Sequence, residues 1–479
     1  MSEHYDYDAI IIGAGISGLV CGCYLAKAGF KTLILEQHVL AGGYCTSFKR
    51  EGYNFDSAIH YFGGLKTGSL HTIIEELGII NEFKFNQLDP SDRIIIPNNE
   101  VLIRSNIEDT VIELKKSWKE ESTNIDAFFE FITATSIATL YRKTIDISFS
   151  ELLSNYFRNS DLKSVISILL HGNMGLPPSK ISAFVAIVFM REFLLDAGYY
   201  PEGGMQSFSN YLVSKFINLK GEIRLSSKVT EIITKFPNVH GIIGEDGKKI
   251  SSKYVVSCID ANQTFNSLIP SRTSEKEKVN RLEISSSVFI VYLGLENDTS
   301  ESAAKCCNTW YFKESDVDAY HNNLLDSFTQ RNAKGILVTF PCAKNNAKIK
   351  HNKHTLQIFI STPSINEDFW INNKESISAN LISTAEEIIP NLRKNINLSF
   401  SATPATLKKY TLNTNGASFG WASTINQTNS FVFPQTTSFE NLILAGHWVT
   451  MGSGQGGIST VALSGKKAAE IIVSRLKNN

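Results

Sequence analysis

The sequence predicts an α/β fold in which a Rossmann-type domain, with a βαβ unit and a parallel sheet, carries an inserted α+β domain with a mainly antiparallel sheet. Three observations predict it. A strand, a glycine-rich turn and a helix open the chain, and another strand, glycine loop and helix close it. Between them lie helix-rich segments and strand-like runs that do not alternate as a parallel sheet would require.

The stretch from Asp8 to Glu36 contains every part of a βαβ dinucleotide-binding unit. Gly13 permits the tight turn after the first strand, Gly15 lets the backbone approach a pyrophosphate, and Gly18 lets helix and strand pack closely. The second strand ends at Glu36, a position from which a carboxylate accepts hydrogen bonds from the ribose hydroxyls. The cofactor-binding residues expected here are Gly13, Ala14, Gly15, Ser17, Gly18, Glu36 and Gln37.

Two further glycine segments indicate that the dinucleotide is FAD. Gly42 and Gly43, followed by Tyr44, lie within reach of the same pyrophosphate. Near the C-terminus a strand leads through GHWVTMGSGQGG into a helix, whose positive end would stabilise negative charge on a reduced flavin ring. No second GxGxxG with a downstream acid offers a dedicated NAD(P)H site. The C-terminal cofactor contacts expected are Gly446, His447, Gly456, Gly457 and Ile458.

Composition narrows the class of protein. With 479 residues, a net charge of -1 and a pI near 6.8, the chain has no electrostatic footprint for nucleic acid. Its seven cysteines form no CxxC pair, so we expect free thiols in a reducing compartment and assign no metal site. The N-terminal residues enter a strand without the basic and apolar regions of a secretory signal. We therefore expect a cytoplasmic protein.

One segment leaves contact with a membrane open. No apolar run reaches the roughly 18 residues that would suggest a membrane span. The most hydrophobic stretch, 181–190, is apolar around the whole helical wheel. It is either a helix buried inside the second domain, or the wall of a lipophilic tunnel or a helix dipping into a membrane surface.

Changes in the pattern of expected helices and strands divide the chain into a discontinuous nucleotide-binding domain and two insertions. The nucleotide-binding domain is expected at 1–85, 200–280 and 405–479, and the substrate-binding domain at 86–199 and 281–404. The first insertion is helix-rich. The second carries the strand-like runs SSVFIVYLGL, GILVTF and LQIFIST and the amphipathic helix ESISANLISTAEEII.

Several motifs resemble the phytoene desaturase family of flavoproteins, and most closely its carotenoid isomerases and retinol saturases. They are GAGISGL, AGGYCTSF, FDSAIHYFGG, TPATLKKYTLNTNGASFG and GSGQGGISTVALSG. Tyr44, Ala58 and Lys409 depart from the residues usual at those positions. The resemblance implies an FAD-dependent desaturase, saturase or isomerase acting on carbon–carbon bonds of a lipophilic conjugated or isoprenoid-like molecule, such as a carotenoid or retinoid. It also implies that Val229 contacts adenine through its backbone and that Cys258 lines the site, although Cys258 also fits an ordinary buried thiol.

His60 and Tyr61 are the candidate catalytic residues. They follow the second glycine motif closely and fall near the junction of the two domains. Histidine titrates near neutrality and serves as acid or base where carbon atoms are saturated or isomerised. The alternatives are that His60 only supports the flavin region and that Tyr61 is a packed ring.

Trp421 and Trp448 are expected to line the substrate pocket, and the alternative for Trp421 is that it packs the domain junction. If both flanked the flavin they would form the aromatic cage of an FAD-dependent amine oxidase, which is one alternative function. A non-catalytic FAD-binding escort protein is the other. Without an NAD(P)H motif, a saturase needs an electron donor and a desaturase an electron acceptor, and neither partner is identified.

Overall fold

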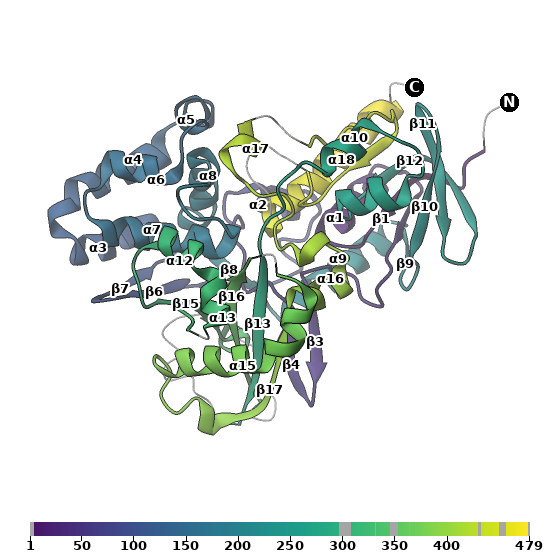
Figure 1. Ribbon diagram of the computed structural model, residues 1–479. Coiled ribbons are helices and arrows are strands. Elements are labelled where there is room, and N and C mark those ends of the chain that lie inside the picture. The colour runs from purple at the N-terminus through teal and green to yellow at the C-terminus, as the bar shows by residue number, and fades with distance from the viewer. Residues whose placement is uncertain are drawn as a thin grey trace.

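The computed structural model describes residues 4–296, 308–330, 332–344, 353–363, 365–429, 433–449 and 457–477. Two seven-stranded sheets organise the described chain, with a lobe of helices to one side and both chain ends on the opposite side (Figure 1). The helices of the lobe are α3 (Ile107–Ser117), α4 (Ser122–Ala134), α5 (Ile137–Thr144), α6 (Phe149–Tyr156), α7 (Ser160–Met174) and α8 (Ala183–Leu194).

The first sheet has the parallel centre of a Rossmann-type unit, as predicted. β1 (Tyr7–Ile12) pairs in parallel with β2 (Thr32–Leu35) on one side and β12 (Lys249–Ser257) on the other. Because helices cover both faces of such a strand, nearly all of β1 is buried and its apolar run is unbroken. The remaining strands are the parallel β9 (Glu222–Arg224) and β18 (Leu442–Leu444) and the antiparallel β10 (Val229–Lys235) and β11 (Asn238–Gly244).

α1 (Ile16–Lys27) packs against this sheet and against α18 (Ile458–Lys477), and glycines set how closely they approach. A Cβ atom added at Gly18 would lie 2.0 Å from the carbonyl oxygen of Gly13, and one at Gly465 would lie 2.2 Å from that of Ser17. No side chain fits at either position without moving the backbone. The neighbouring helices are α2 (Ser69–Glu76) and α9 (Met205–Asn218).

The second sheet is mainly antiparallel, as predicted, and its one parallel pair is β14 with β6. The amphipathic helix expected beside it is α15 (Glu367–Glu386), which packs against β15, β16 and β17 (Figure 1). In spatial order the strands are β17 (Ile396–Ala402), β13 (Ser287–Leu295), β16 (His354–Thr362), β15 (Gly335–Thr339), β14 (Asn308–Phe312), β6 (Asp92–Ile96) and β7 (Asn99–Ile103).

Smaller elements connect the two sheets. Two antiparallel pairs, β3 with β4 and β5 with β8, lie outside both of them. The bounds are β3 (Ser47–Arg50), β4 (Tyr53–Asp56), β5 (Phe85–Leu88), β8 (Gly198–Pro201), α10 (Ser274–Val279), α12 (Val317–Asn322), α13 (Leu324–Thr329), α14 (Pro341–Lys344), α16 (Pro404–Thr411) and α17 (Ile425–Asn429).

Strand pairing bears on the proposed division of the chain. β6 and β7 come from the helix-rich segment 86–199 but join the sheet built from 281–404, so the two insertions share one sheet. This arrangement supports the division into a nucleotide-binding and a substrate-binding part, which stays a proposal. The expected free thiols are found at Cys21, Cys23, Cys45 and Cys258. Within the described ranges, no helix combines the length and the hydropathy needed to span a membrane.

Gly465→Ala is expected to lower the free energy of unfolding by about 1–3 kcal/mol, because it forces a methyl group into a packed contact. This loss should exceed the roughly 1 kcal/mol by which alanine is favoured over glycine inside a helix. Urea unfolding followed by circular dichroism measures it. Ser474→Ala, at an exposed position of the same helix, is the control. Unchanged stability in Gly465→Ala would contradict the close packing of α1 against α18.

Candidate FAD and substrate site

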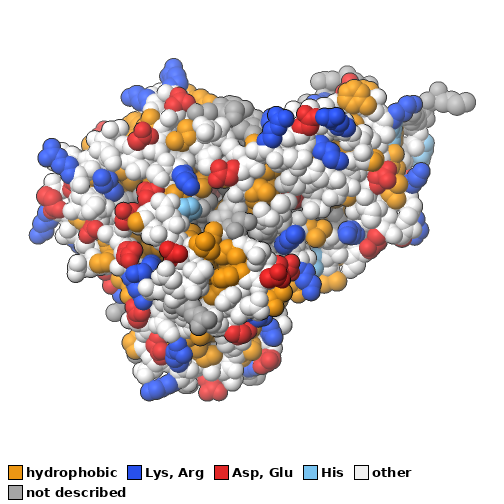
Figure 2. Space-filling view, viewed as in Figure 1, with side chains coloured by type: hydrophobic (Ala, Val, Ile, Leu, Met, Phe, Trp, Pro, Cys, Tyr) orange, Lys and Arg blue, Asp and Glu red, His pale blue; other side chains and the backbone are white. Residues whose placement is uncertain are grey.

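One cavity of about 1000 Å³ runs from the carboxyl ends of β1, β2 and β12 to the second sheet. Ligands of open parallel sheets gather at such strand ends. The cavity therefore begins where a dinucleotide is expected and continues into an apolar region. Figure 2 shows apolar side chains gathered near the middle of one face, between the helical lobe and the part that carries the chain ends.

Glu36 organises the dinucleotide end through two main-chain hydrogen bonds. The N–H of Ala14 donates to Oε2 of Glu36 and the N–H of His38 donates to Oε1, both at 2.8 Å. The N–H of Gly42 donates to the carbonyl oxygen of Ala14, also at 2.8 Å. These bonds join the first glycine turn, the acid after β2 and the second glycine segment into one rim around the cavity.

The glycines of this rim leave room for a pyrophosphate. A Cβ added at Gly15 would meet no atom of the described residues within 4 Å, and the same holds at Gly457. Gly15 caps α1 without a side-chain hydrogen bond, and the first turn of α1 contains no acidic residue. The N–H groups and positive dipole of this helix end are thus available to an anion. The chain fits FAD here.

The structure brings most of the predicted cofactor-binding residues to the cavity. Ala14 and Gly18 stand behind the wall instead, where Ala14 bonds Glu36 and Gly18 packs on Gly13. Gly456 lies outside the described residues. Contact with FAD remains a prediction for each residue that lines the cavity: Gly13, Gly15, Ser17, Glu36, Gln37, Gly42, Gly43, Tyr44, Val229, Cys258, Gly446, His447, Gly457 and Ile458.

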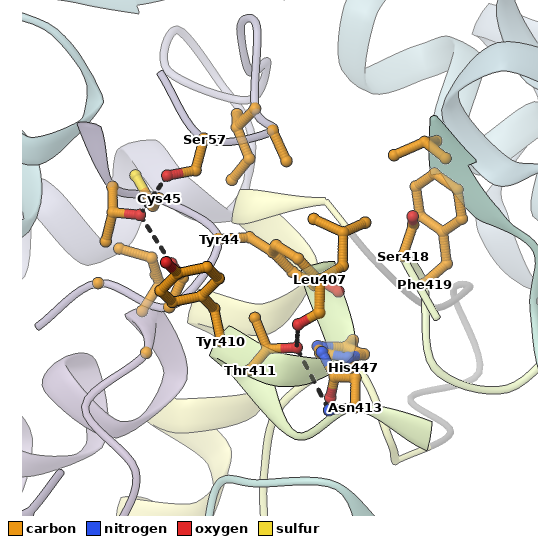
Figure 3. A pocket seen from close by; sticks show the side chains of 18 of the residues that line it. Tyr44, Cys45, Ser57, Leu407, Tyr410, Thr411, Asn413, Ser418, Phe419 and His447 are labelled. Carbon is orange, nitrogen blue, oxygen red and sulfur yellow. Dashed lines mark hydrogen bonds between the residues drawn. The ribbon is translucent and has the colours of Figure 1, made fainter. Parts of the chain in front are cut away.

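Segments far apart in sequence meet along one wall of the cavity (Figure 3). The hydroxyl of Tyr44 donates to the carbonyl oxygen of Ala417 at 2.9 Å, and the Tyr44 ring lies 6.2 Å from that of His447. Burial lowers the pKa of His447 to about 4, so the ring is neutral at neutral pH. Burial raises the pKa of Cys258 to about 12, which describes an unreactive thiol on the wall.

His60 and Tyr61 also line the cavity, with their rings 4.8 Å apart. Burial, reinforced by the ammonium of Lys344, lowers the pKa of His60 well below its usual value. Burial and the carboxylate of Asp92 raise the pKa of Tyr61 well above its usual value. Both side chains are consequently neutral at neutral pH. No residue in the described part of the chain hydrogen-bonds Nδ1 of His60.

A buried polar cluster supports the His60 segment from behind. Nζ of Lys344 donates to the carbonyl oxygen of His60 at 2.5 Å and to Oδ1 of Asn308 at 2.6 Å. Asp92 accepts hydrogen bonds from Nε1 of Trp310 at 2.7 Å and from Nδ2 of Asn308 at 3.3 Å. This network fixes the backbone at His60. Its members lie far apart along the chain, and no motif in the sequence marks them.

Trp421 and Trp448 do not line the cavity formed by the described residues, contrary to the expected pocket-wall position. Both indoles are buried in the core beside it, 4.8 Å apart and nearly perpendicular. Nε1 of Trp421 donates to the carbonyl oxygen of Trp448, and Nε1 of Trp448 donates to Oδ1 of Asn413, both at 2.8 Å. Each N–H is satisfied within this core, which also contains Ile10 and Val255 of the first sheet, so both indoles pack the protein interior.

Aromatic and aliphatic side chains line the other end of the cavity. α8 is largely buried, as predicted, and its residues Phe189, Glu192 and Phe193 form part of the wall. Thus the helix is both a core element and one side of a tunnel. Glu192 was not predicted as a site residue, although a lone acid ending a long apolar run was visible in the sequence. The second sheet contributes Trp310, Phe312, Ile336, Leu337, Phe359 and Phe400.

Comparison with known proteins agrees with this geometry. A family model described as flavin-containing amine oxidoreductase matches residues 16–361. The chain is similar to an all-trans-retinol 13,14-reductase of Danio rerio, with 24% identity over 87% of this chain and 77% of that protein. It is also similar to a chloroplastic prolycopene isomerase of Daucus carota, with 25% identity over 98% and 80%. These relatives confirm the resemblance drawn from the glycine and FDSAIHYFGG motifs, and the cofactor is FAD.

Solved structures share the fold. An oxidoreductase from Methanosarcina mazei superimposes with a TM-score of 0.70 at 16% identity, covering 96% of this chain and 99% of that one. A putrescine oxidase bound to putrescine gives a TM-score of 0.67 at 14% identity, covering 98% and 99%. At these identities the likeness concerns the fold and not the substrate.

Gly15→Val is expected to abolish FAD binding and leave the fold intact, because its side chain would occupy the open space meant for the pyrophosphate. The flavin-to-protein absorbance ratio of the variant should fall below about a tenth of the wild-type value. After FAD is removed from both proteins, the variant and the wild type should have the same melting temperature. Gly18→Ala is the matched contrast, since its methyl group meets backbone and should lower stability by about 1–3 kcal/mol. A Gly15→Val protein that retains full FAD would contradict the assignment.

Proposed function

The chain belongs to the flavin-containing amine oxidoreductase family, and from this we propose that it is an FAD-dependent enzyme acting on carbon–carbon double bonds of a lipophilic, conjugated isoprenoid-like molecule. The proposed substrate belongs to the class of carotenoids and retinoids. The reaction is desaturation, saturation or isomerisation. The retinol reductase and prolycopene isomerase relatives support this class by the reactions in their names.

The continuity of the cavity is the observation that carries the proposal. The same space is lined by the dinucleotide glycines Gly13 and Gly15 and by Phe189, Trp310 and Phe359. A long apolar molecule entering the second part would reach the cofactor without leaving an apolar environment. Burying its surface stabilises binding by roughly 25 cal/mol per Å² of apolar area.

The residues of the chain would bind, orient and keep water out. FAD, when bound, supplies two-electron hydride exchange. The aromatic wall excludes water, so that hydride and protons are not lost to solvent. His60 and Tyr61, the catalytic candidates, line the cavity, and in this proposal they contact the substrate as neutral polar groups while Lys344 holds His60 through its carbonyl oxygen.

Contact with a membrane surface and an unidentified electron donor or acceptor belong to the same proposal. Leu40 and Tyr410 line the cavity and are 38% and 58% exposed, and neighbouring Val39 is 64% exposed. Exposed apolar side chains at a cavity mouth favour entry of a lipophilic substrate from a lipid phase. Lys49 and Arg50 also line the cavity and are exposed, and their positive charges suit an anionic lipid surface.

Anaerobic spectroscopy of the holoenzyme tests the proposal. Oxidised protein would be mixed with putrescine as the amine probe. Oxidised and chemically reduced protein would each be mixed with all-trans-retinol or prolycopene, with products separated by chromatography. We expect conversion of at least one polyene, with flavin reoxidation if a double bond is saturated and without it if the polyene is isomerised.

Each rival function predicts a different result. Bleaching of the oxidised flavin by putrescine, with both polyenes unchanged, would favour an amine oxidase. Full FAD occupancy with no reaction towards any probe in either redox state would favour the non-catalytic escort. Purified protein that cannot bind FAD would contradict all three.

His60→Ala is expected to retain FAD and to lower turnover of the polyene at least about tenfold, because the substrate loses a polar contact beside the reacting carbon atoms. The absorbance ratio and the initial rate are measured separately. His240→Ala, in β11 and outside the cavity lining, is the control. Equal rates for His60→Ala and wild type would remove His60 from the reaction, and loss of FAD would assign it a supporting role for the cofactor.

A further inference from the structure

α8 contains one acidic residue, Glu192, and this residue lines the cavity. It follows Phe189 by three positions and precedes Phe193, so the three share the helix face turned towards the cavity. A carboxyl group among aromatic side chains is costly to bury in its charged form. A tunnel that needed only apolar walls would not require an acid at this position.

The Glu192 carboxyl group lies where three segments converge. A Cβ atom added at Gly64 would lie 2.8 Å from Oε1 of Glu192 and 2.9 Å from Oγ of Ser459. The Ser459 hydroxyl donates to the carbonyl oxygen of Gly63 at 2.9 Å. Ser459 is in the first turn of α18, the helix end expected to face the flavin ring, and Gly63 and Gly64 end the FDSAIHYFGG motif. Glu192 therefore lies at the boundary between the FAD end and the apolar end of the cavity.

No cation of the described chain neutralises Glu192. The guanidinium of the adjacent Arg191 donates instead to the carbonyl oxygens of Thr133 and Thr135, at 2.8 and 2.6 Å. Asp196, one turn later, accepts hydrogen bonds from the N–H groups of Thr67 and Gly68. The other titratable groups on nearby elements are His60, Tyr61, His71, His171, Tyr199, Lys344 and Lys466. Lys344 is bound behind His60, Nε2 of His71 lies 3.9 Å from Oε2 of Glu75, and Lys466 pairs with Glu76.

Burial is the main cause of an elevated pKa at Glu192. It raises the pKa from its ordinary 4.5 to about 7, the Ser459 hydroxyl opposes the shift, and the charge of Asp196 adds to it. Below that pH the group is protonated and can donate, and above it the group is ionised and can accept. Burial lowers the pKa of His171 to about 3, so this other cavity residue is neutral across the same range.

We propose that Glu192 is the catalytic residue that exchanges a proton with a carbon atom of the substrate double bond, an inference that rests on the proposed function. When the bond is saturated, FAD that is bound and reduced would supply hydride to one carbon as the π bond opens. Glu192 would give its O–H proton to the neighbouring carbon and become a carboxylate, and the cofactor would be left oxidised. Desaturation is the reverse. In isomerisation Glu192 gives a proton to a carbon and takes one back, so that no electrons are exchanged overall.

A pH titration of the holoenzyme's visible spectrum tests Glu192 without turnover, because flavin absorbance responds to charge near the ring. The wild type should show one transition near pH 7, Glu192→Gln should lack it, and Glu192→Asp should retain one. Asp196→Asn should lower the pH at the midpoint of this transition, because the charge of Asp196 raises the pKa of Glu192. Ser459→Ala should increase the midpoint pH, because the Ser459 hydroxyl lowers that pKa. A transition that persists unchanged in Glu192→Gln, or is absent from the wild type, would overturn the proposal.

The rate of substrate conversion gives a second test of Glu192. The substrate is all-trans-retinol or prolycopene, whichever the wild type converts. Glu192→Gln should retain FAD and lose about 10²-fold to 10⁴-fold in rate, the usual effect of removing a general acid or base. The wild-type rate should change with pH near 7, and this dependence should vanish in the variant. Equal rates overturn the role of Glu192 alone. Failure of the wild type to convert either polyene counts against the proposed function instead.

Discussion

The close approach of α1 to the turn after β1 and to α18 is the constraint on which the rest of the structure depends. Glycine at 18 and 465 lets the two helices meet with Ser17 at their contact. This contact joins the two ends of the chain, so that glycine loops separated by more than 400 residues reach one cavity. The hydrogen bond from Ser459 to Gly63 then ties the start of α18 to the FDSAIHYFGG motif.

Burial gives several titratable side chains of the cavity wall a second shared property, which is that they are uncharged at neutral pH. His60, His171 and His447 have lowered pKa values and Tyr61 and Cys258 have raised ones, each with burial as the largest cause. Uncharged side chains at this part of the wall suit an apolar substrate and a transferred hydride. Glu192 differs from these groups because its charge changes near neutral pH, so it is the group of this set able to supply or remove a proton there.

Local signals in the sequence predicted the fold and the FAD cofactor. The GxGxxG turn, Glu36 and the C-terminal glycine loop each carry their chemistry within a few residues. The pairing of β6 and β7 with the second sheet was not predictable in the same way, since it depends on contacts between distant segments. Trp421 and Trp448 were misplaced for the same reason, because Asn413 and the Trp448 carbonyl group satisfy their N–H groups in the core. Lys344 and Asp92 are distant in the sequence, and folding joins them through their hydrogen bonds with Asn308.

The central claim is that one cavity holds FAD and a lipophilic polyene together. Mass spectrometry of the small molecules extracted from protein purified without detergent tests it most directly, with Gly15→Val treated in parallel. We expect the wild type to release both FAD and a conjugated isoprenoid-type molecule. The Gly15→Val variant should release the isoprenoid-type molecule but no FAD. Recovery of polar amines with FAD, or of lipids equally bound by an unrelated protein prepared in the same way, would contradict it.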